Sequence, residues 1–302
     1  MRVVGFTSFG DPSVLSVADV PLPEPGKGQV RIRVQAATVN PGDIAVRSGA
    51  FGPMLPEGPR YVLGWDVAGT VDAGTAGFAQ GDHVVGVSDW LETKRGTHAE
   101  FVVLDAAAIA PAPAGVDLVE AATFPVNSLT ADQALDLLGL AEGQTLVVTG
   151  AAGAVGGYAV ELARLRGLDV VGIGSVQDEA FITGLGATFL PRSEDPARVL
   201  REVKVDGLLD AAVIGAPALA AVRDGGAYVS VLPPATPPAE RGIRVETVLV
   251  RSDGARLREL VALVEQGRLT LRLAQTFTFD QAAQAHELLA KGGVRGRIVL
   301  VP

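Results

Sequence analysis

Cysteine is absent from the 302 residues of this sequence. Its absence excludes disulfide bonds, a thiolate nucleophile, iron–sulfur clusters and every zinc site that needs sulfur ligands. Positive charge is scarce too, because 25 Lys and Arg residues are outnumbered by 34 Asp and Glu residues, which gives a formal net charge of −9. Nucleic acids and anionic membranes attract basic chains, so we expect no nucleic acid and no membrane among the partners.

Long apolar runs are missing as well. The longest segment without a charged residue, 143–160, is interrupted by Gly150, Gly153, Gly156 and Gly157, which is not typical of a membrane helix. The first residues, MRVVGFTSFGD, lack the apolar core of a signal peptide, so we expect a cytoplasmic protein. At this length and with 48% hydrophobic residues, the sequence predicts two domains, each with its own core.

The sequence changes character near residue 118. Before it, Pro and Gly interrupt short alternating apolar segments, which predicts an irregular antiparallel domain with strands at 29–39, 67–74 and 82–87. After it, helical patterns alternate with compact apolar strands, and such alternation is typical of a parallel sheet covered on both faces. These strands are predicted at 145–150, 169–174, 207–213 and 227–232.

The end of the chain adds two helical patterns, at 255–267 and 279–293, and a last strand at 295–302. We place the parallel-sheet domain at 119–258 and expect 259–302 to complete the first domain, 1–118. The predicted fold class is therefore α/β, with a β-rich domain and a doubly wound parallel sheet.

A glycine-dense turn joins the strand TLVVTG to the helical pattern that follows it. Gly150, Gly153 and Gly156 would allow a tight turn, a close approach of the backbone to a pyrophosphate, and packing of the helix near the sheet. The spacing is Gly-x-x-Gly-x-x-Gly, and no Lys follows it as in a P-loop. The alternative is a close-packed crossover without a ligand.

The next strand bears on the cofactor. Sites for NAD tend to carry an acidic residue about twenty residues after the turn, whereas this strand ends in Gly174-Ser175. A 2′-phosphate would meet no carboxylate at the strand end, the Ser175 hydroxyl could donate to it, and Arg192 could neutralise it. The alternatives are an ordinary turn residue for Ser175 and a solvated charge for Arg192, and Asp178 and Glu179 follow closely.

With these residues placed, the chain resembles the medium-chain dehydrogenase/reductase superfamily, in its zinc-independent quinone oxidoreductase branch. The resemblance runs nearly end to end and rests on several motifs in the expected order. They are NPGD at 40–43 with Arg47 and Gly49 after it, LGWDVAGTV at 63–71, GDHVVG at 81–86, THAEFVV at 97–103, FPVNSLTADQAL at 124–135 and GAAGAVGGYAVELAR at 150–164. The last of these resembles the family's A-A-G-x-V-G turn.

The resemblance implies a GroES-like catalytic domain, a Rossmann domain, and NADPH bound in the cleft between them. Asn40 and Thr130 are then expected near the nicotinamide, although both would also suit turn capping. The remaining cofactor contacts implied by the resemblance and the glycine turn are Gly150, Ala152, Gly153, Ala154, Val155, Gly156, Ser175, Arg192, Val213, Ile214, Gly215, Val231, the strand Val248 to Val250 with Leu249, and Arg297.

The resemblance also implies that no metal is bound. Zinc-dependent relatives use Cys and the His of a G-H-E motif, and this chain has Trp65 in that place. Its histidines, His83, His98 and His286, lie outside any metal-ligand spacing. Alcohol oxidation through a zinc alkoxide is therefore not expected.

Without a Lewis acid, hydride needs an acceptor that delocalises charge by itself, such as a quinone or an α,β-unsaturated carbonyl. The family's Tyr after R-x-G is replaced here by Phe51, so we name no catalytic acid and expect the proton to come from water. Asn40, Phe51 and Tyr61 are candidates for the substrate cleft, with packing as the alternative for the two aromatic residues.

Two further expectations concern partners and function. The apolar segment RVETVLV at 244–250 would leave an exposed strand edge, which together with the family's habit predicts a homodimer. The alternative to an NADPH-dependent reductase is an NADPH-binding protein of the same fold with a sensing or structural role.

Overall fold

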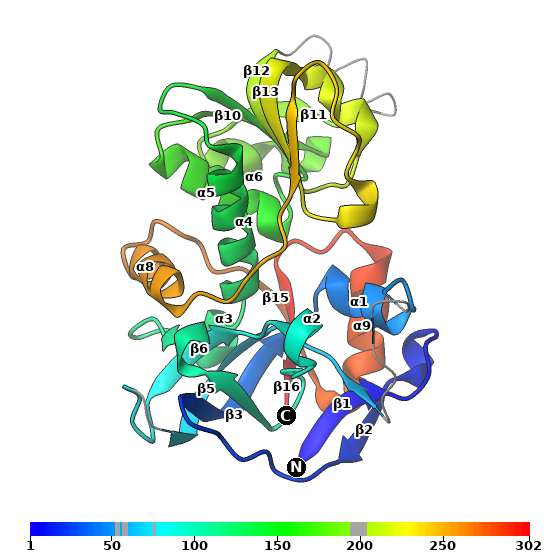
Figure 1. The fold of residues 1–302 in the computed structure, drawn as a ribbon, viewed down its shortest axis with the longest axis vertical. Helices are drawn as coiled ribbons and strands as arrows, with labels where there is room; N and C mark the ends of the chain where they lie inside the picture. Colours follow the sequence, from blue (N-terminus) through cyan, green and yellow to red (C-terminus); the bar gives the residue numbers. More distant parts are fainter. Residues whose placement is uncertain (52–54, 56–59, 75–76, 194–203) are drawn as a thin grey trace. The chain divides into compact units, whose positions relative to one another are not determined.

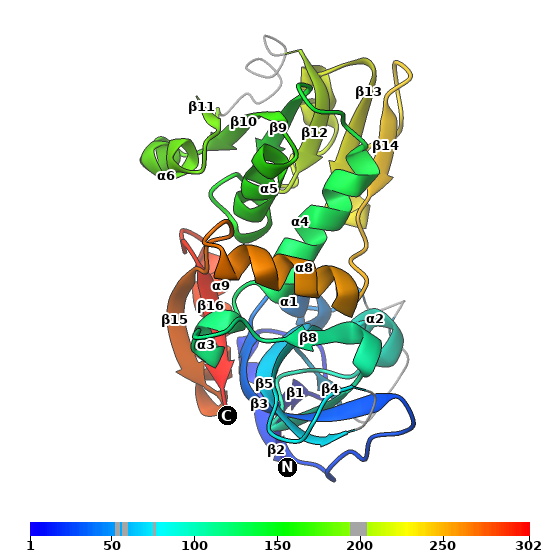
Figure 2. The same ribbon diagram turned by 90° about the vertical axis from the view of Figure 1, so that its left-hand side faces the viewer.

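The computed structural model describes residues 1–51, 55, 60–74, 77–193 and 204–302. The chain folds into two units: unit 1 comprises Met1–Val126 and Arg251–Pro302, and unit 2 comprises Asn127–Val250. Figures 1 and 2 show both from two sides. In the described part of the chain, no helix is both long and apolar enough to span a membrane.

Unit 1 is built around antiparallel strands, as the alternating apolar pattern predicted. A small sheet has the order β2-β1-β4, and a larger sheet has the order β15-β16-β3-β5-β6-β8, with β7 also paired to β3. The strands are β1 (Arg2–Phe6), β2 (Ser16–Asp19), β3 (Gln29–Thr38), β4 (Tyr61–Val62), β5 (Asp66–Gly74), β6 (His83–Val87), β7 (Phe101–Asp105), β8 (Ile109–Pro111), β15 (Leu273–Thr278) and β16 (Arg297–Val301).

The helices of unit 1 are mostly short. They are η1 (Pro12–Val14), α1 (Pro41–Arg47), α2 (Trp90–Thr93), η3 (Ala106–Ala108), α3 (Leu118–Ala121), α8 (Gly254–Glu265), η7 (Phe279–Gln281) and α9 (Ala282–Lys291). The C-terminal segment is integral to this unit, because β16 pairs with β3 in the register Val299↔Thr38 and Leu300↔Ala37. The side chains of Ile298 and Leu300 are buried in the core beside Val39.

Unit 2 contains the predicted parallel sheet. Among the described residues its strands have the order β11-β10-β9-β12-β13-β14, all parallel, which is the Rossmann order 3-2-1-4-5-6 (Figure 2). The strands are β9 (Thr145–Thr149), β10 (Asp169–Gly174), β11 (Thr188–Pro191), β12 (Val205–Asp210), β13 (Val222–Ser230) and β14 (Arg244–Thr247). The helices are α4 (Pro125–Leu138), α5 (Ala154–Leu165), η4 (Val176–Asp178), α6 (Glu179–Gly184), η5 (Ala216–Ala221) and η6 (Pro233–Ala235).

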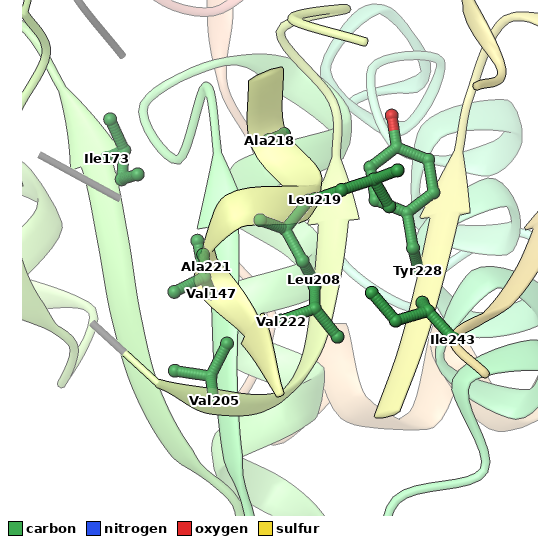
Figure 3. Close-up of a cluster of buried hydrophobic side chains, with 10 residues drawn as sticks. All are labelled: Val147, Ile173, Val205, Leu208, Ala218, Leu219, Ala221, Val222, Tyr228 and Ile243. Atoms are coloured by element: carbon green, nitrogen blue, oxygen red, sulfur yellow. The ribbon is translucent and has the colours of Figure 1, made fainter. Parts of the chain in front are cut away.

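The core of unit 2 explains why these strands are continuous apolar runs. Alternate residues of a strand face opposite sides, and Val147, Leu208 and Tyr228 lie on one face against Leu219 and Val222 (Figure 3). Helix α5 packs against β9 and β10. Both faces are therefore covered, and apolar residues are required at nearly every position.

One predicted strand is wrong in its extent. Val248 to Val250 were expected to be strand, but β14 ends at Thr247. Beyond it the Val248 amide still donates to the Ser230 carbonyl at 2.9 Å, and Leu249 is 54% exposed. The apolar pattern runs past the strand because it continues into an extended connection.

Candidate active site

A cavity of about 350 Å³ opens in unit 2 where the parallel strands end. Its walls come from the carboxyl ends of β9, β10, β11 and β12 and from the turns after them. In an open sheet of this order, the crevice at the point where strand order reverses is the usual place for a ligand. The lining residues are Thr149, Gly150, Ala152, Gly153, Ile173, Gly174, Ser175, Asp178, Pro191, Arg192, Ser193, Ala211, Ala212 and Ile214.

The glycine turn forms one wall of this cavity. Gly150 has a φ of +62°, a conformation that L side chains rarely adopt. A Cβ on Gly156 would lie only 2.1 Å from the Gly150 carbonyl oxygen, so the start of α5 approaches the turn more closely than any side chain allows. Gly153 is the N-cap of α5 and lines the cavity. The unpaired N–H groups at such a helix start favour an anion, and the turn therefore suits a pyrophosphate.

The segment after β10 differs from the simplest expectation. The Ser175 hydroxyl donates to Asp178 Oδ2 at 2.5 Å, and the Ser175 amide donates to the same oxygen at 3.2 Å. The carboxylate three residues on caps the start of η4, and both residues line the cavity. A hydroxyl predicted to donate to a 2′-phosphate is thus held by a carboxylate, which brings negative charge to the cavity wall.

Arg192 follows β11, the strand next to β10, and lines the same cavity as this carboxylate-bearing turn. Its backbone amide donates to the Gly174 carbonyl at 2.7 Å, which fixes the residue directly after β11, and Arg192 lines the cavity. Among the described residues that line the cavity, Arg192 is the basic side chain and Asp178 the acidic one.

The segment 211–215, which follows β12, forms a further part of the wall through Ala211, Ala212 and Ile214. Val213 has a φ of 59°, which is rare for a β-branched side chain. Such a left-handed residue costs about 1–2 kcal/mol and is found where the surroundings hold it in place. The Ala212 amide donates to Thr149 Oγ1 at 2.9 Å, and the Gly215 amide donates to Asp210 Oδ2 at 2.8 Å. These two contacts stand on either side of Val213.

Two predicted residues meet in unit 1. Asn40, 7% exposed, accepts a hydrogen bond through Oδ1 from an Arg297 guanidinium nitrogen at 2.5 Å, and its amide nitrogen donates to the Thr38 carbonyl at 3.3 Å. The same Arg297 nitrogen donates to Thr38 Oγ1 at 2.8 Å. Asp66 accepts from that hydroxyl at 2.7 Å, and burial raises the pKa of its carboxyl to about 6. The orientation of the Asn40 carboxamide is therefore fixed by buried neighbours.

Phe51 and Tyr61 belong to an aromatic cluster of unit 1. Both are half-buried against a core that contains Phe6 and Trp90. The Tyr61 ring stacks on Phe6 with centroids 5.2 Å apart. Trp65 packs on Trp90 at 5.6 Å. This cluster supplies an apolar surface. Its contacts support a packing role for Phe51 and Tyr61, which was the alternative to a place in the substrate cleft.

The remaining predicted residues lie in several places. Gly150, Ala152, Gly153, Ser175, Arg192 and Ile214 line the cavity of unit 2. Those outside its lining are Ala154, Val155 and Gly156 in α5, Val213 and Gly215 in the segment after β12, Thr130 in α4, and Val231, Val248 and Leu249 at the ends of β13 and β14. Their contacts with a cofactor stay predictions.

The sequence interpretation missed Thr149 and Asp210. They are the last residues of β9 and β12, and Thr149 Oγ1 donates to Asp210 Oδ1 at 2.6 Å. A signal was available, because each ends an apolar strand with a buried polar side chain, and buried polar groups need partners. The pairing itself spans 61 residues and could not be predicted from local patterns.

The residues present do not fit a catalytic zinc. The family resemblance places Trp65 where zinc-dependent relatives have a His ligand. Within the described ranges no group of three or more His, Asp or Glu side chains could hold a metal ion.

A parallel sheet of this order with a glycine turn at its crevice defines a dinucleotide-binding oxidoreductase fold. Two family models match the chain: "Alcohol dehydrogenase GroES-like domain" over residues 26–114 and "Zinc-binding dehydrogenase" over residues 185–300. The chain belongs to the medium-chain dehydrogenase/reductase superfamily, in its quinone oxidoreductase-like branch.

Individual relatives agree with this assignment. A solved NAD-dependent alcohol dehydrogenase is 32% identical with a TM-score of 0.86, and both chains are covered fully (100%). The quinone oxidoreductase from Coxiella burnetii is 28% identical with a TM-score of 0.89, covering 100% of this chain and 99% of that one. The chloroplastic NADPH-dependent alkenal/one oxidoreductase of Arabidopsis thaliana is 28% identical over 100% of this chain and 80% of its own length. Family membership implies a nicotinamide cofactor.

Proposed function

We propose that the protein transfers hydride from NADPH to a quinone or to the C=C bond of an α,β-unsaturated carbonyl, without zinc. The observation that carries this proposal is the side chain at the metal position: Trp65, packed on Trp90, replaces a ligand that the zinc-dependent chemistry requires. The names of the relatives, a quinone oxidoreductase and an alkenal/one oxidoreductase, support the same acceptor classes.

The chain's own residues would bind the dinucleotide and orient its nicotinamide. The start of α5 and the glycine turn bind the pyrophosphate through backbone N–H groups. The Asn40 carboxamide, held by Arg297 and Thr38, would be the hydrogen-bonding group for the nicotinamide that the family resemblance implies. The bound nicotinamide supplies the hydride, and a quinone or enone takes the electron density onto its own oxygen. The proton then comes from solvent.

A panel of acceptors tests the reaction. We expect NADPH oxidation with quinones and activated enones, and none with simple ketones. Turnover confined to alcohols and ketones would contradict the argument from Trp65. No turnover with any acceptor, despite NADPH binding, would favour the sensing or structural role instead.

The preference for NADPH rests on Arg192. Its positive charge at the cavity wall suits a 2′-phosphate, whereas the nearby Asp178 opposes it, so we expect a modest preference. A charge-assisted hydrogen bond contributes about 1.5–3 kcal/mol, and about 1.4 kcal/mol is a factor of ten. Arg192→Ala should weaken NADPH binding about tenfold or more and leave NADH unchanged. An equal loss for both cofactors, or none, would show that Arg192 is not the phosphate partner.

Metal independence has a direct test. Elemental analysis of the purified protein should show no stoichiometric zinc, and a chelator should leave activity intact. Stoichiometric zinc together with loss of activity on chelation would refute the proposal.

A homodimer through the edge of the Rossmann sheet completes the proposal. Strand β14 is the last strand of the sheet order, and the exposed Leu249 follows it. An unpaired edge with an apolar neighbour favours pairing with a second copy. Light scattering should give about twice the 31.0 kDa of one chain, and a monomer mass would refute it.

A further inference from the structure

A network of hydrogen bonds between buried polar groups, here called the tie, joins the ends of the two central strands of unit 2. Thr149 and Asp210 are register partners at the carboxyl ends of β9 and β12. Thr149 Oγ1 donates to Asp210 Oδ1 at 2.6 Å and accepts from the Ala212 amide at 2.9 Å. Both residues are fully buried, each with 0% exposure. One hydroxyl therefore connects the strand before the glycine turn to the segment after β12.

The other oxygen of the same carboxylate completes the tie. Asp210 Oδ2 accepts from the Gly215 amide at 2.8 Å and from the Tyr228 hydroxyl at 2.8 Å. Tyr228 is on β13, so the carboxylate is fixed from three sides. The contacts at Ala212 and Gly215 fasten the segment 211–215 on both sides of Val213.

This segment would not keep its shape without such anchors. Val213 is held at φ 59° although its side chain is 37% exposed and gains little from packing. A β-branched residue disfavours this conformation. The hydrogen bonds from the Ala212 amide to the Thr149 hydroxyl and from the Gly215 amide to the Asp210 carboxylate offset this strain. Cutting them should let the segment relax to other conformations.

The shape of the segment matters to the cavity. Ala211, Ala212 and Ile214 line it directly, and a Cβ on Gly150 would lie 3.3 Å from the Ala212 amide nitrogen, so the glycine turn rests against this segment. Any shift of the segment therefore changes two walls of the same cavity.

We propose that Thr149 and Asp210 are positioning residues for the dinucleotide: their tie holds the strained segment 211–215 as a preformed wall of the cavity. The inference rests on the proposed function, because it takes the cavity to be the site of a nicotinamide dinucleotide. A preformed wall lowers the ordering cost of binding. Unlike Arg192, the tie carries no group proposed to meet a 2′-phosphate, so it would not distinguish the two cofactors.

Thr149→Val tests the proposal, because valine keeps the shape of threonine and removes both hydrogen bonds. We expect the Kd for NADPH and the Kd for NADH, measured by titration calorimetry, to rise together by about tenfold or more. Thr149→Ser keeps the hydroxyl and should bind like the wild type. Tyr228→Phe removes one of the three donors to the same carboxylate but leaves the anchors at Ala212 and Gly215 in place, so it should raise both Kd values by less than Thr149→Val does.

A double-mutant cycle separates positioning from general destabilisation. Glycine adopts a positive φ without strain, so in a Val213→Gly background the tie is no longer needed to hold the segment. Thr149→Val should then raise the Kd by no more than about threefold. An equal effect in both backgrounds would overturn the proposal. If Thr149→Val does not fold, Asp210→Asn is measured in the same two backgrounds with the same expectation.

The outcomes also distinguish the inference from the proposed function. A wild-type protein that binds neither dinucleotide overturns both. A wild type that binds, together with a Thr149→Val variant of unchanged affinity, overturns the positioning role alone. A selective loss of NADPH affinity would contradict it as well, because a preformed wall serves both cofactors.

Discussion

His286 should make the protein sensitive to mild acid. It lies on α9 with 0% exposure, and among the described residues neither ring nitrogen has a hydrogen-bond partner. Burial, with a smaller contribution from the positive charges of His98 and Arg47, lowers the pKa of its imidazole from 6.5 to about 3. Protonation in the folded state would place a charge in an apolar environment beside a buried guanidinium.

The size of the effect follows from linkage. Because the folded pKa lies below that of the unfolded chain, the unfolded state takes up the proton first. The stabilisation is fully present above pH 6.5 and is lost as the pH falls toward 3. Each pKa unit corresponds to about 1.4 kcal/mol, so between pH 7 and pH 5 the free energy of unfolding should fall by about 2 kcal/mol through this residue alone.

The assay is urea unfolding of the wild type and of His286→Leu at pH 5, 6 and 7. Leucine has a similar volume and does not titrate, so the stability difference between the two proteins should shift by about 2 kcal/mol in favour of leucine at pH 5. His83→Gln, a substitution at an exposed histidine, is the control for the effect of replacing a histidine as such. Parallel pH profiles for the wild type and His286→Leu would refute the reasoning.

Two other predictions follow from the fold. Gly156→Ala would place a Cβ 2.1 Å from the Gly150 carbonyl oxygen, so it should lower the melting temperature and weaken dinucleotide binding more than tenfold. Gly184→Ala is the control, because nothing lies within 4 Å of its Cβ, and it should change neither quantity. Unchanged binding by Gly156→Ala would contradict the close approach of α5 to the turn. Asp66→Asn removes a carboxyl whose pKa is raised from 3.8 to about 6 by burial, and such a group destabilises the fold as the pH rises through that range. The stability difference should therefore move by about 2 kcal/mol in favour of Asp66→Asn between pH 4 and pH 7, as measured by urea unfolding, and a shift of the opposite sign would refute it.

The fold was predictable where burial imposes a pattern. Strands such as β9 and β10 are apolar throughout because both faces of the sheet are covered, and the predicted ranges match them closely. The first half of β13 was missed, since Arg223 and Asp224 are exposed and carry no apolar signal. β14 was extended too far because apolar residues continue after its last strand residue, Thr247.

The candidate site was predictable where backbone geometry demands a residue type. Gly150 and Gly156 are required by a positive φ and by a contact that admits no side chain, and both leave a mark in the sequence. Ser175 shows the limit of this reasoning. The Ser-x-x-Asp spacing to Asp178 is typical of a helix cap, and in the structure the Ser175 hydroxyl donates to the Asp178 carboxylate. The expected contact of Ser175 with a 2′-phosphate left this capping hydrogen bond out. Thr149 and Asp210 depend on contacts across the sheet, which periodicity does not reveal.

The pairing of β16 with β3 also constrains how the protein is made. Unit 2 is continuous in sequence and can fold as soon as residue 250 has left the ribosome. Unit 1 cannot close at that point, because the strand that pairs with Ala37 and Thr38 and the Phe277 and Leu300 side chains of its core are synthesised after unit 2. Until then β3 can pair with β5 and β7 but lacks its partner at Ala37 and Thr38. Unpaired strand residues beside an incomplete core are a site for chaperone binding or aggregation during translation.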